Sequence, residues 1–316
     1  MEPATPFGSK KACILVATGK PFAKTAVDGI RKIIEEAGGE LQLLEKYTGD
    51  DALCQAVTDA DGLIVRSDKV TKEVIAAAGK LKIVVRAGAG YDNLDLAACT
   101  ARGIVAMNTP GQNSNAVAEL AIGMMIYMAR NAFQPGTGSE LKGKKLGIHA
   151  YGNVGRIVAA IGKGFGMEVY AFDPFVPQVA IEKDGVKVCA TAEELYSQCQ
   201  YVSLHIPSTG QTKQSIGYAL LAALPEGGCL VNTARKEVIN EAELLRALDE
   251  RADLKYVSDI APDNHAVLQE KFGARYFSTP KKMGAETAEA NINAGIAAAR
   301  QIVNFFKYGD RTFQVN

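Results

Sequence analysis

Glycines in the segment 150–155 are spaced as they are in loops that bind phosphate groups. The run AYGNVG follows the apolar run Lys145–His149 directly and opens a helix-like segment, and its spacing is that of G-x-G-x-x-G with Ala150 in the first position. Gly152 would let the backbone approach a pyrophosphate, and Gly155 would let the helix and the strand pack closely. The N-terminus of the helix would add free N–H groups and positive dipole charge. The residues expected at this site are Tyr151, Gly152, Asn153, Val154 and Gly155.

An acidic residue ends the next strand-like run, at the spacing that a dinucleotide site requires. Asp173 follows Glu168–Phe172 and lies eighteen residues after Gly155. Its carboxylate can accept hydrogen bonds from the hydroxyls of an adenosine ribose and would repel a 2′-phosphate, so NAD is favoured over NADP. The alternative is a glycine-rich turn of an ordinary α/β protein, but three agreeing features favour the nucleotide site. We expect Ala150 to cost little, because the turn needs only a small residue.

Strand-like and helix-like segments alternate along the chain, which is the pattern of βαβ units with parallel sheets. One series runs from Cys13 to Met107 and a second from Lys145 to Ser278. Between them lies a long helix-like segment, Ser114–Arg130, with apolar residues on more than one face, so we expect it to be buried on several sides. The strands expected are 13–17, 41–44, 63–65, 83–85, 104–107, 145–149, 168–172, 201–204, 229–232, 256–259 and 276–278. The other helices expected are 23–37, 52–58, 70–78, 94–101, 153–163, 192–199, 218–223, 241–250 and 285–306.

Length and charge limit the classes of function. At 316 residues the chain exceeds the usual size of one core, which favours two domains. Lys plus Arg equals Asp plus Glu at 35 each, so no global field would hold a nucleic acid or a membrane surface. The six cysteines are scattered without a C-x-x-C pair, which fits a reducing compartment. Met1–Lys10 lacks the apolar core of a signal peptide, and no apolar stretch reaches the ~18 residues that span a bilayer. We expect a soluble, cytoplasmic protein with a loose N-terminal tail.

Several further motifs resemble those of one enzyme family. RAGAGYDN (86–93), NTPGQNS (108–114), VAE (117–119), the glycine-rich segment and NTAR (232–235) match, in order and spacing, the motifs of the D-2-hydroxyacid dehydrogenases. Val65-Arg66-Ser67 together with RAGAG resembles the D-3-phosphoglycerate dehydrogenase branch, in its short form. The resemblance covers nearly the whole chain from about Cys13 onward.

The resemblance implies an α/β fold in which a Rossmann domain is inserted in a smaller, flavodoxin-like domain. Residues 1–109 and 285–316 would form the substrate-binding domain, and residues 110–284 the NAD-binding domain. Hinges would lie near 109–110 and 284–285, and homodimers would form through the helix 114–130. The reaction implied is NAD-dependent oxidation of D-3-phosphoglycerate to 3-phosphohydroxypyruvate, which leads into serine biosynthesis. Longer members of the family carry C-terminal regulatory domains, and because this chain stops at Asn316 we do not expect feedback inhibition through one.

A substrate with a phosphate and a carboxylate needs several cationic or N–H donors in a neutral protein. Arg66 and Arg86 each end an apolar strand-like run, where a cation has no structural reason to lie unless it meets an anion, so we expect both to bind the phosphate. The alternative is that they pair with surface carboxylates. The turn Gly88-Ala89-Gly90 can present consecutive N–H groups to the substrate carboxylate. The substrate-binding residues expected are Arg66, Ser67, Arg86, Gly88, Ala89 and Gly90.

The resemblance also assigns roles in the second half of the chain. Arg235 resembles the family's catalytic arginine, whose planar fork holds the substrate carboxylate and polarises the C2 oxygen. His205 and Pro207 would shape the adenine pocket, so His205 is a poor candidate for the catalytic base. The cofactor-binding residues implied beyond the glycine-rich segment are Asp173, His205, Pro207, Thr212, Thr233, Ala234, Arg235, Asp259 and Gly284. No metal is expected.

The acid–base pair of the family is missing. The family has a histidine two residues before the Gly-Ala that opens the last helix, where this chain has lysine, with one extra residue after Pro280. Counting back from Gly284 gives Lys282, which we prefer, and counting from Pro280 gives Lys281. Burial beside Arg235 would lower the pKa of Lys282, as a proton acceptor requires. The alternative is that Lys282 only anchors the substrate. Where the family's orienting glutamate belongs, the chain offers Asp263 or Asn264, and His265 is a weaker substitute for the histidine.

Two other functions remain open from the sequence. One is a hydroxypyruvate or glyoxylate reductase, which would not need the phosphate ligands Arg66 and Arg86. The other is a non-catalytic, NAD(H)-sensing scaffold that has lost catalysis along with the His–Glu pair. Against the scaffold, both substrate arginines and Arg235 are present, and no charged tail or docking extension is visible.

Overall fold

The chain folds as two compact units, each with its own sheet. In a computed structural model, residues 11–113 with Glu286–Asn316 form one unit, here called the outer unit, and Ser114–Ala285 form the other, here called the inner unit. The structure describes residues 11–316, so the tail expected at 1–10 lies outside the described residues. The inner unit is thus inserted in the sequence of the outer one.

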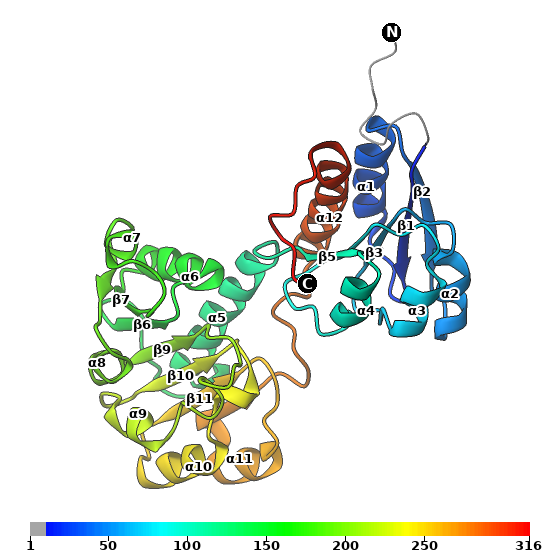
Figure 1. Ribbon diagram of the computed structural model, residues 1–316. Coiled ribbons are helices and arrows are strands. Elements are labelled where there is room, and N and C mark those ends of the chain that lie inside the picture. Colours follow the sequence, from blue (N-terminus) through cyan, green and yellow to red (C-terminus); the bar gives the residue numbers. More distant parts are fainter. Residues whose placement is uncertain (1–10) are drawn as a thin grey trace. The chain divides into compact units, whose positions relative to one another are not determined.

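The outer unit is built on a five-stranded parallel sheet with the strand order β2-β1-β3-β4-β5 (Figure 1). This is the flavodoxin-like order, so the predicted fold class of this part is confirmed. The strands are β1 (Cys13–Thr18), β2 (Glu40–Glu45), β3 (Gly62–Val65), β4 (Ile83–Arg86) and β5 (Val105–Asn108). The helices are α1 (Lys24–Glu36), α2 (Asp50–Val57), α3 (Lys72–Ala77), α4 (Leu96–Ala101) and α12 (Ala288–Tyr308).

Helix α12, from the end of the chain, packs beside α1 on one face of this sheet (Figure 1). Ile30 and Ile34 of α1 share a core with Ala298 and Ile302 of α12, and all four side chains are buried. Fully burying an isoleucine stabilises a fold by about 1.5–3 kcal/mol, so this pairing ties the two ends of the chain together. Helices α2, α3 and α4 cover the opposite face with a second core.

The inner unit contains a seven-stranded parallel sheet with the order β12-β11-β10-β9-β6-β7-β8. Around β6 the order is that of a Rossmann domain, which confirms the second half of the predicted fold class. The strands are β6 (Lys145–His149), β7 (Glu168–Phe172), β8 (Lys187–Val188), β9 (Tyr201–Leu204), β10 (Cys229–Asn232), β11 (Lys255–Ser258) and β12 (Tyr276–Ser278). The α-helices are α5 (Ser114–Ala129), α6 (Asn153–Gly164), α7 (Gln178–Glu182), α8 (Ala192–Gln198), α9 (Tyr218–Ala223), α10 (Glu241–Glu250) and α11 (His265–Phe272).

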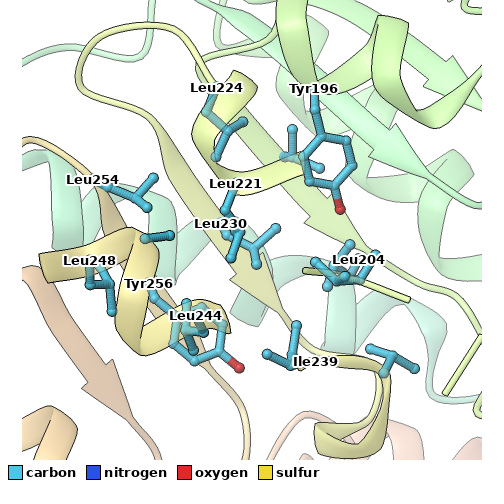
Figure 2. Packing of buried hydrophobic residues seen from close by; sticks show 14 of the residues in the cluster. Tyr196, Leu204, Leu221, Leu224, Leu230, Ile239, Leu244, Leu248, Leu254 and Tyr256 are labelled. Atoms are coloured by element: carbon cyan, nitrogen blue, oxygen red, sulfur yellow. The ribbon is translucent and has the colours of Figure 1, made fainter. Parts of the chain in front are cut away.

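Both faces of the inner sheet are covered by apolar cores. On one face, leucines from α9, β10 and α10 pack with the buried Tyr196 and Tyr256, as Figure 2 shows. On the other face, α5 contributes Met124, Met125 and Met128, which are all buried. The expectation that the long helix is buried on several sides is confirmed along most of α5.

One strand and two α-helices were not predicted, and several of the predicted boundaries differ by one to three residues from those of the structure. β8 has only two residues, and α7 and α11 bury too few side chains to show an apolar period; α11, for example, buries only Leu268 and Phe272. Helix α12 begins at Ala288 instead of residue 285, because Thr287 caps it through a hydrogen bond from the Ala290 amide at 3.1 Å.

The helix composition, the possible metal ligands and the cysteines bear on the class of protein. Within residues 11–316, none of the helices combines the length and the apolar character needed to cross a membrane. The same part of the chain holds no cluster of three His, Cys, Asp or Glu residues that could bind a metal ion. All six cysteines are free, and four of them are buried.

Candidate active site

The glycine-rich segment opens α6 with the geometry of an anion-binding helix start. Gly152 is the N-cap of α6, and no side chain caps the helix there. A Cβ atom added at Gly152 would meet no atom within 4 Å, so the space above it is open to a ligand. At Gly155 a Cβ atom would lie 2.3 Å from the Ala150 carbonyl oxygen and 2.9 Å from Ile148 Cγ2, so only glycine allows the helix to pack this closely on β6.

The expectation that Ala150 costs little is wrong. Ala150 has a φ of 81°, in the left-handed region that glycine adopts freely and that costs other residues roughly 1–2 kcal/mol. Its amide donates to the Phe172 carbonyl at 2.9 Å, which fixes the residue at the carboxyl end of β6. The turn therefore requires a backbone conformation as well as a small side chain.

Asp173 joins the glycine-rich segment to the loop after β7. Its carboxylate accepts hydrogen bonds from the backbone amides of Tyr151 at 2.7 Å, Phe175 at 2.8 Å and Val176 at 3.2 Å. One lone pair of Oδ2 stays available, because that oxygen takes only the Tyr151 amide. Beside Asp173 lies a shallow pocket of about 480 Å³ between the loop 172–178 and residues 188–190. Phe175, 87% exposed, lines this pocket and was missed by sequence reasoning; an aromatic residue just after Asp173-Pro174 was the available signal.

His205 and the loop that follows it are held by local hydrogen bonds. The Thr212 hydroxyl donates to the Pro207 carbonyl, and the Thr209 amide donates to Thr212 Oγ1 at 2.8 Å. His205 Nε2 is buried without a partner, and burial, together with His149, lowers the pKa of His205 to about 3. The ring is therefore neutral at physiological pH, and this supports the interpretation that His205 is not the catalytic base.

The turn after β10 brings Thr233, Ala234 and Arg235 to the carboxyl edge of the sheet. Asn232, which is buried, bridges this turn: its Oδ1 accepts from the Ala234 amide at 3.0 Å and its Nδ2 donates to the Arg235 carbonyl at 3.0 Å. Thr233 Oγ1 is buried and has no hydrogen-bond partner in the described part of the chain. Sequence reasoning used Asn232 only as part of a motif, and its role in shaping the turn was missed.

Lys282 and Arg235 meet at one backbone carbonyl. Lys282 Nζ donates to the Ala234 carbonyl oxygen at 2.6 Å, and Arg235 Nη1 donates to the same oxygen at 2.9 Å. Lys282 as a whole residue is exposed. Desolvation of its amino group and the charge of Arg235 nevertheless lower the pKa of Lys282 to about 8, and Asp259 and Glu237 oppose this lowering with smaller effects. Lys281 is exposed and has no such contact. A lysine with this pKa can exchange a proton near neutral pH.

Asp259 holds the loop that carries Lys282. This buried carboxylate accepts from Thr279 Oγ1 at 3.0 Å, from the Met283 amide at 2.8 Å and from the Gly284 amide at 2.7 Å. All three bonds lie within the inner unit and fix the loop on both sides of Lys282. The resemblance places Asp259 at the nicotinamide, and the structure adds this clamping contact.

The three residues considered as substitutes for the family's glutamate and histidine do not contact Lys282. Asp263 pairs with Lys236, and its exposed carboxylate has no contact with Lys282. The Asn264 amide donates to Glu241 at 3.0 Å. His265 Nδ1 lies 2.9 Å from the Tyr276 hydroxyl and 3.1 Å from the Ser278 hydroxyl. The structure therefore brings none of these three residues to Lys282.

In the outer unit, Arg86 folds over the turn that follows it. Gly88 has a φ of 150°, and a Cβ atom there would lie 1.6 Å from Arg86 Nη1, so only glycine is compatible with this arrangement. The Gly88 amide donates to the Arg86 carbonyl at 2.9 Å. The expected set of three consecutive free N–H groups at residues 88–90 is therefore wrong at Gly88, and Ala89 and Gly90 are the remaining candidates.

Arg66 is held by neutral groups. Its guanidinium donates to the Lys20 carbonyl at 3.3 Å and to Asn291 Oδ1, and it lies 5.2 Å from the centre of the Phe22 ring. Within residues 11–316 the structure pairs Arg66 with no carboxylate, so the alternative of a surface ion pair is wrong for this residue. The neighbouring Ser67 is exposed.

Comparison with known proteins gives the family. Residues 111–276 match the family model described as "D-isomer specific 2-hydroxyacid dehydrogenase, NAD binding domain", which covers more than half of the chain. The chain belongs to this family. Among solved structures, the NAD⁺-bound 3-phosphoglycerate dehydrogenase of Entamoeba histolytica is 51% identical with a TM-score of 0.85, and the match covers 97% of this chain and 99% of that one.

Some curated relatives of this family member are longer than the chain. The D-3-phosphoglycerate dehydrogenases of Methanocaldococcus jannaschii and Homo sapiens are each 36% identical, over 86% and 90% of this chain. The chain spans about half of their length, 54% and 56% respectively. The hydroxypyruvate reductase of Thermotoga maritima is 32% identical, over 83% of this chain and 90% of that protein.

The inner unit of this family member fits a dinucleotide. The start of α6 lacks a capping side chain, and Gly152 opens onto free space. Two buried polar atoms, Thr233 Oγ1 and His205 Nε2, have no hydrogen-bond partner among residues 11–316. Buried polar atoms are almost always hydrogen-bonded, so two orphans along the carboxyl edge of one sheet indicate groups that meet a ligand.

Proposed function

We propose that this protein is an NAD-dependent D-3-phosphoglycerate dehydrogenase that forms 3-phosphohydroxypyruvate. The observation that carries the proposal is the shared contact of Lys282 and Arg235 with the Ala234 carbonyl, which places a proton acceptor beside an anion-binding cation. The names of the curated relatives and of the Entamoeba histolytica structure support the choice of substrate.

NAD would bind along the carboxyl edge of the inner sheet and supply a hydride acceptor for the substrate C2. The free amides at the start of α6, Gly152–Gly155, would bind the pyrophosphate. Asp173 would accept a hydrogen bond from a hydroxyl of the adenosine ribose with its remaining lone pair. The residues that would hold the two ends of the dinucleotide are His205, Pro207 and Thr212 at the adenine and Thr233, Ala234, Arg235, Asp259 and Gly284 at the nicotinamide.

Arg235 would bind the substrate carboxylate and the C2 oxygen. Within residues 11–316, the Arg235 side chain uses one N–H group, which donates to the Ala234 carbonyl, so the rest of the guanidinium fork is available for a two-point contact. Neutral Lys282 would accept the C2 hydroxyl proton during oxidation, and its ammonium form would return it during reduction. The positive charge of Arg235 favours the neutral amine, because two like charges so close together repel each other.

The substrate phosphate would bind in the outer unit. Arg66, Ser67 and Arg86 lie at or just after the carboxyl ends of β3 and β4, the edge at which open α/β sheets bind ligands. Ala89 and Gly90, after the turn at Gly88, would bind the carboxylate. In this proposal residues 1–109 and 285–316 form the substrate-binding domain, and residues 110–284 form the NAD-binding domain.

We also propose a cytoplasmic homodimer. The exposed residues of the otherwise buried helix α5, Asn115, Glu119 and Gly123, form a stripe at i, i+4 spacing that would face a second copy. The six free cysteines support a reducing compartment. Sedimentation of the purified protein would test the dimer.

A hydroxypyruvate reductase is the second candidate, because the Thermotoga maritima enzyme of that name matches over 90% of its length. NADH consumption with phosphohydroxypyruvate, hydroxypyruvate and glyoxylate separates the two functions. We expect kcat/KM to be at least ~10-fold higher for the phosphorylated substrate, since a charged contact is worth about that much. Equal values would favour the reductase. Binding of NADH without turnover of any of the three would favour a sensing scaffold.

A further inference from the structure

Arg66 is held in a different way from the arginines that form ion pairs, and it has neutral contacts in common with Arg102 and Arg275, which donate to backbone carbonyls. Arg156, Arg246 and Arg251 form ion pairs with carboxylates at 2.8, 2.9 and 2.5 Å. Arg66 is oriented by a peptide carbonyl, an amide oxygen and an aromatic ring. Neutral contacts fix the direction of a guanidinium without cancelling its charge, which is what an anion-binding arginine needs.

The amide oxygen belongs to Asn291, in the first turn of α12. Asn291 Nδ2 donates to the Thr287 carbonyl at 2.9 Å, and this bond decides which way the amide lies, so that Oδ1 points to Arg66 Nη2. Thr287 in turn caps α12. The contact joins residues that lie 225 positions apart in the sequence.

The backbone of Arg66 is held by hydrogen bonds, as its guanidinium group is. Its carbonyl oxygen accepts from Arg86 Nε at 3.1 Å and from Asn93 Nδ2 at 3.2 Å. The backbone of Arg66 is thereby joined to the side chain of Arg86, and the Asn291 side chain accepts a hydrogen bond from the Arg66 guanidinium. An arginine whose backbone and guanidinium are both held loses little conformational freedom when an anion binds.

We propose that Asn291 is a positioning residue for recognition of the substrate phosphate: it aims Arg66 and leaves its charge available. The inference rests on the proposed function, in which Arg66 binds a phosphate. Its amide also has to be neutral, because a carboxylate in the same place would neutralise Arg66 and compete with the anion.

The test replaces Asn291 by aspartate and measures KM for phosphohydroxypyruvate, with Asn293→Asp as the control. Asn293 lies two residues away on α12, is exposed and does not contact Arg66. The Asn293→Asp variant therefore adds the same negative charge without placing it against the Arg66 guanidinium. We expect Asn291→Asp to raise KM for phosphohydroxypyruvate by ~10-fold or more, with kcat and the KM for hydroxypyruvate within ~2-fold of wild type. Asn291→Gln, which keeps an amide oxygen, should recover part of the loss. Equal KM values in the Asn291→Asp and Asn293→Asp variants would overturn the proposal.

Binding of inorganic phosphate separates this inference from the proposed activity. Calorimetry should show at least ~10-fold weaker phosphate binding to Asn291→Asp than to wild type or Asn293→Asp. If wild type turns over no phosphorylated substrate, the proposed activity fails, and the phosphate affinities still decide the role of Asn291. If Asn291→Asp does not fold, Asn291→Leu with Asn293→Leu gives the same comparison, because leucine removes the acceptor that aims Arg66.

Discussion

Lys282 and Arg235 donate hydrogen bonds to the same acceptor, the carbonyl oxygen of Ala234, at 2.6 and 2.9 Å. In the family's usual site a histidine is oriented by a glutamate, whereas here a lysine is oriented by a peptide carbonyl. A carbonyl accepts a hydrogen bond without carrying a full negative charge, so it stabilises the ammonium less than a carboxylate would. Desolvation of the amino group and the charge of Arg235 can therefore lower the pKa of Lys282 without being offset by a carboxylate in hydrogen-bond contact.

Replacement of Lys282 by alanine should remove the proton acceptor of the proposed reaction. We expect kcat for oxidation of 3-phosphoglycerate to fall by about 10²–10⁴-fold, the usual range for a general base. The control is Lys281→Ala, which removes an exposed neighbouring lysine that does not contact Ala234 and should keep kcat within ~2-fold. Steady-state kinetics decide the matter: a Lys282→Ala enzyme with full kcat across the pH range rules out the assignment.

The pH dependence should have opposite signs in the two directions. Oxidation needs neutral Lys282, so its rate should rise with pH through about 8, the pKa of this lysine; reduction needs the ammonium and should fall above the same pH. Glu237 opposes the lowering of this pKa, so Glu237→Gln should move the midpoint to lower pH. Glu270→Gln, the same charge change at an exposed residue of α11, should leave it in place. Identical pH profiles for both variants would contradict the electrostatic argument.

Substitution of Ala150 by glycine should stabilise the protein. The left-handed φ of 81° strains alanine, and relief of roughly 1–2 kcal/mol exceeds the entropy cost of a glycine, about 0.5–1 kcal/mol. The free energy of unfolding in urea should therefore rise by about 0.5–1 kcal/mol. Ala160→Gly, at an exposed position within α6, should lower it by a similar amount. A loss of stability in Ala150→Gly would show that the turn is not strained.

Removal of the charge of Asp173 should change the choice of dinucleotide. Asp173→Ala loses the carboxylate that repels a 2′-phosphate and the acceptor for three loop amides. We expect KM for NAD to rise by ~10-fold or more and the ratio of kcat/KM for NADP to that for NAD to rise. Asp249→Asn, whose native carboxylate pairs with Lys271 on the surface, serves as the control for loss of an acidic residue. An unchanged ratio would remove Asp173 from the ribose site.

Local patterns of the sequence predicted the fold and supplied the residues of the candidate site, because both depend on short-range features. The alternation of strands and helices gave both sheets, and the distance to Gly284 pointed to Lys282. The Arg66–Asn291 contact could not be predicted, because it joins residues 225 positions apart through one rotamer. The strain at Ala150 was missed because a sequence gives the size of a side chain but not the φ of its backbone.

Asp259 should affect kcat by holding the loop that carries Lys282, without contacting the substrate oxygen itself. Its carboxylate accepts three hydrogen bonds, from Thr279 Oγ1 and from the amides of Met283 and Gly284. Both carboxylate oxygens must therefore act as acceptors. In Asp259→Asn the amide N–H₂ would face at least one of these donors, and a buried donor left unpaired costs about 1–3 kcal/mol. The loop that carries Lys282 would loosen, so we expect a lower Tm and a lower kcat together. Thr279→Val, which removes one of the three bonds and keeps the carboxylate, should lower kcat less. Measured kcat values that are equal in Asp259→Asn and wild type would show that the loop holds Lys282 without this clamp.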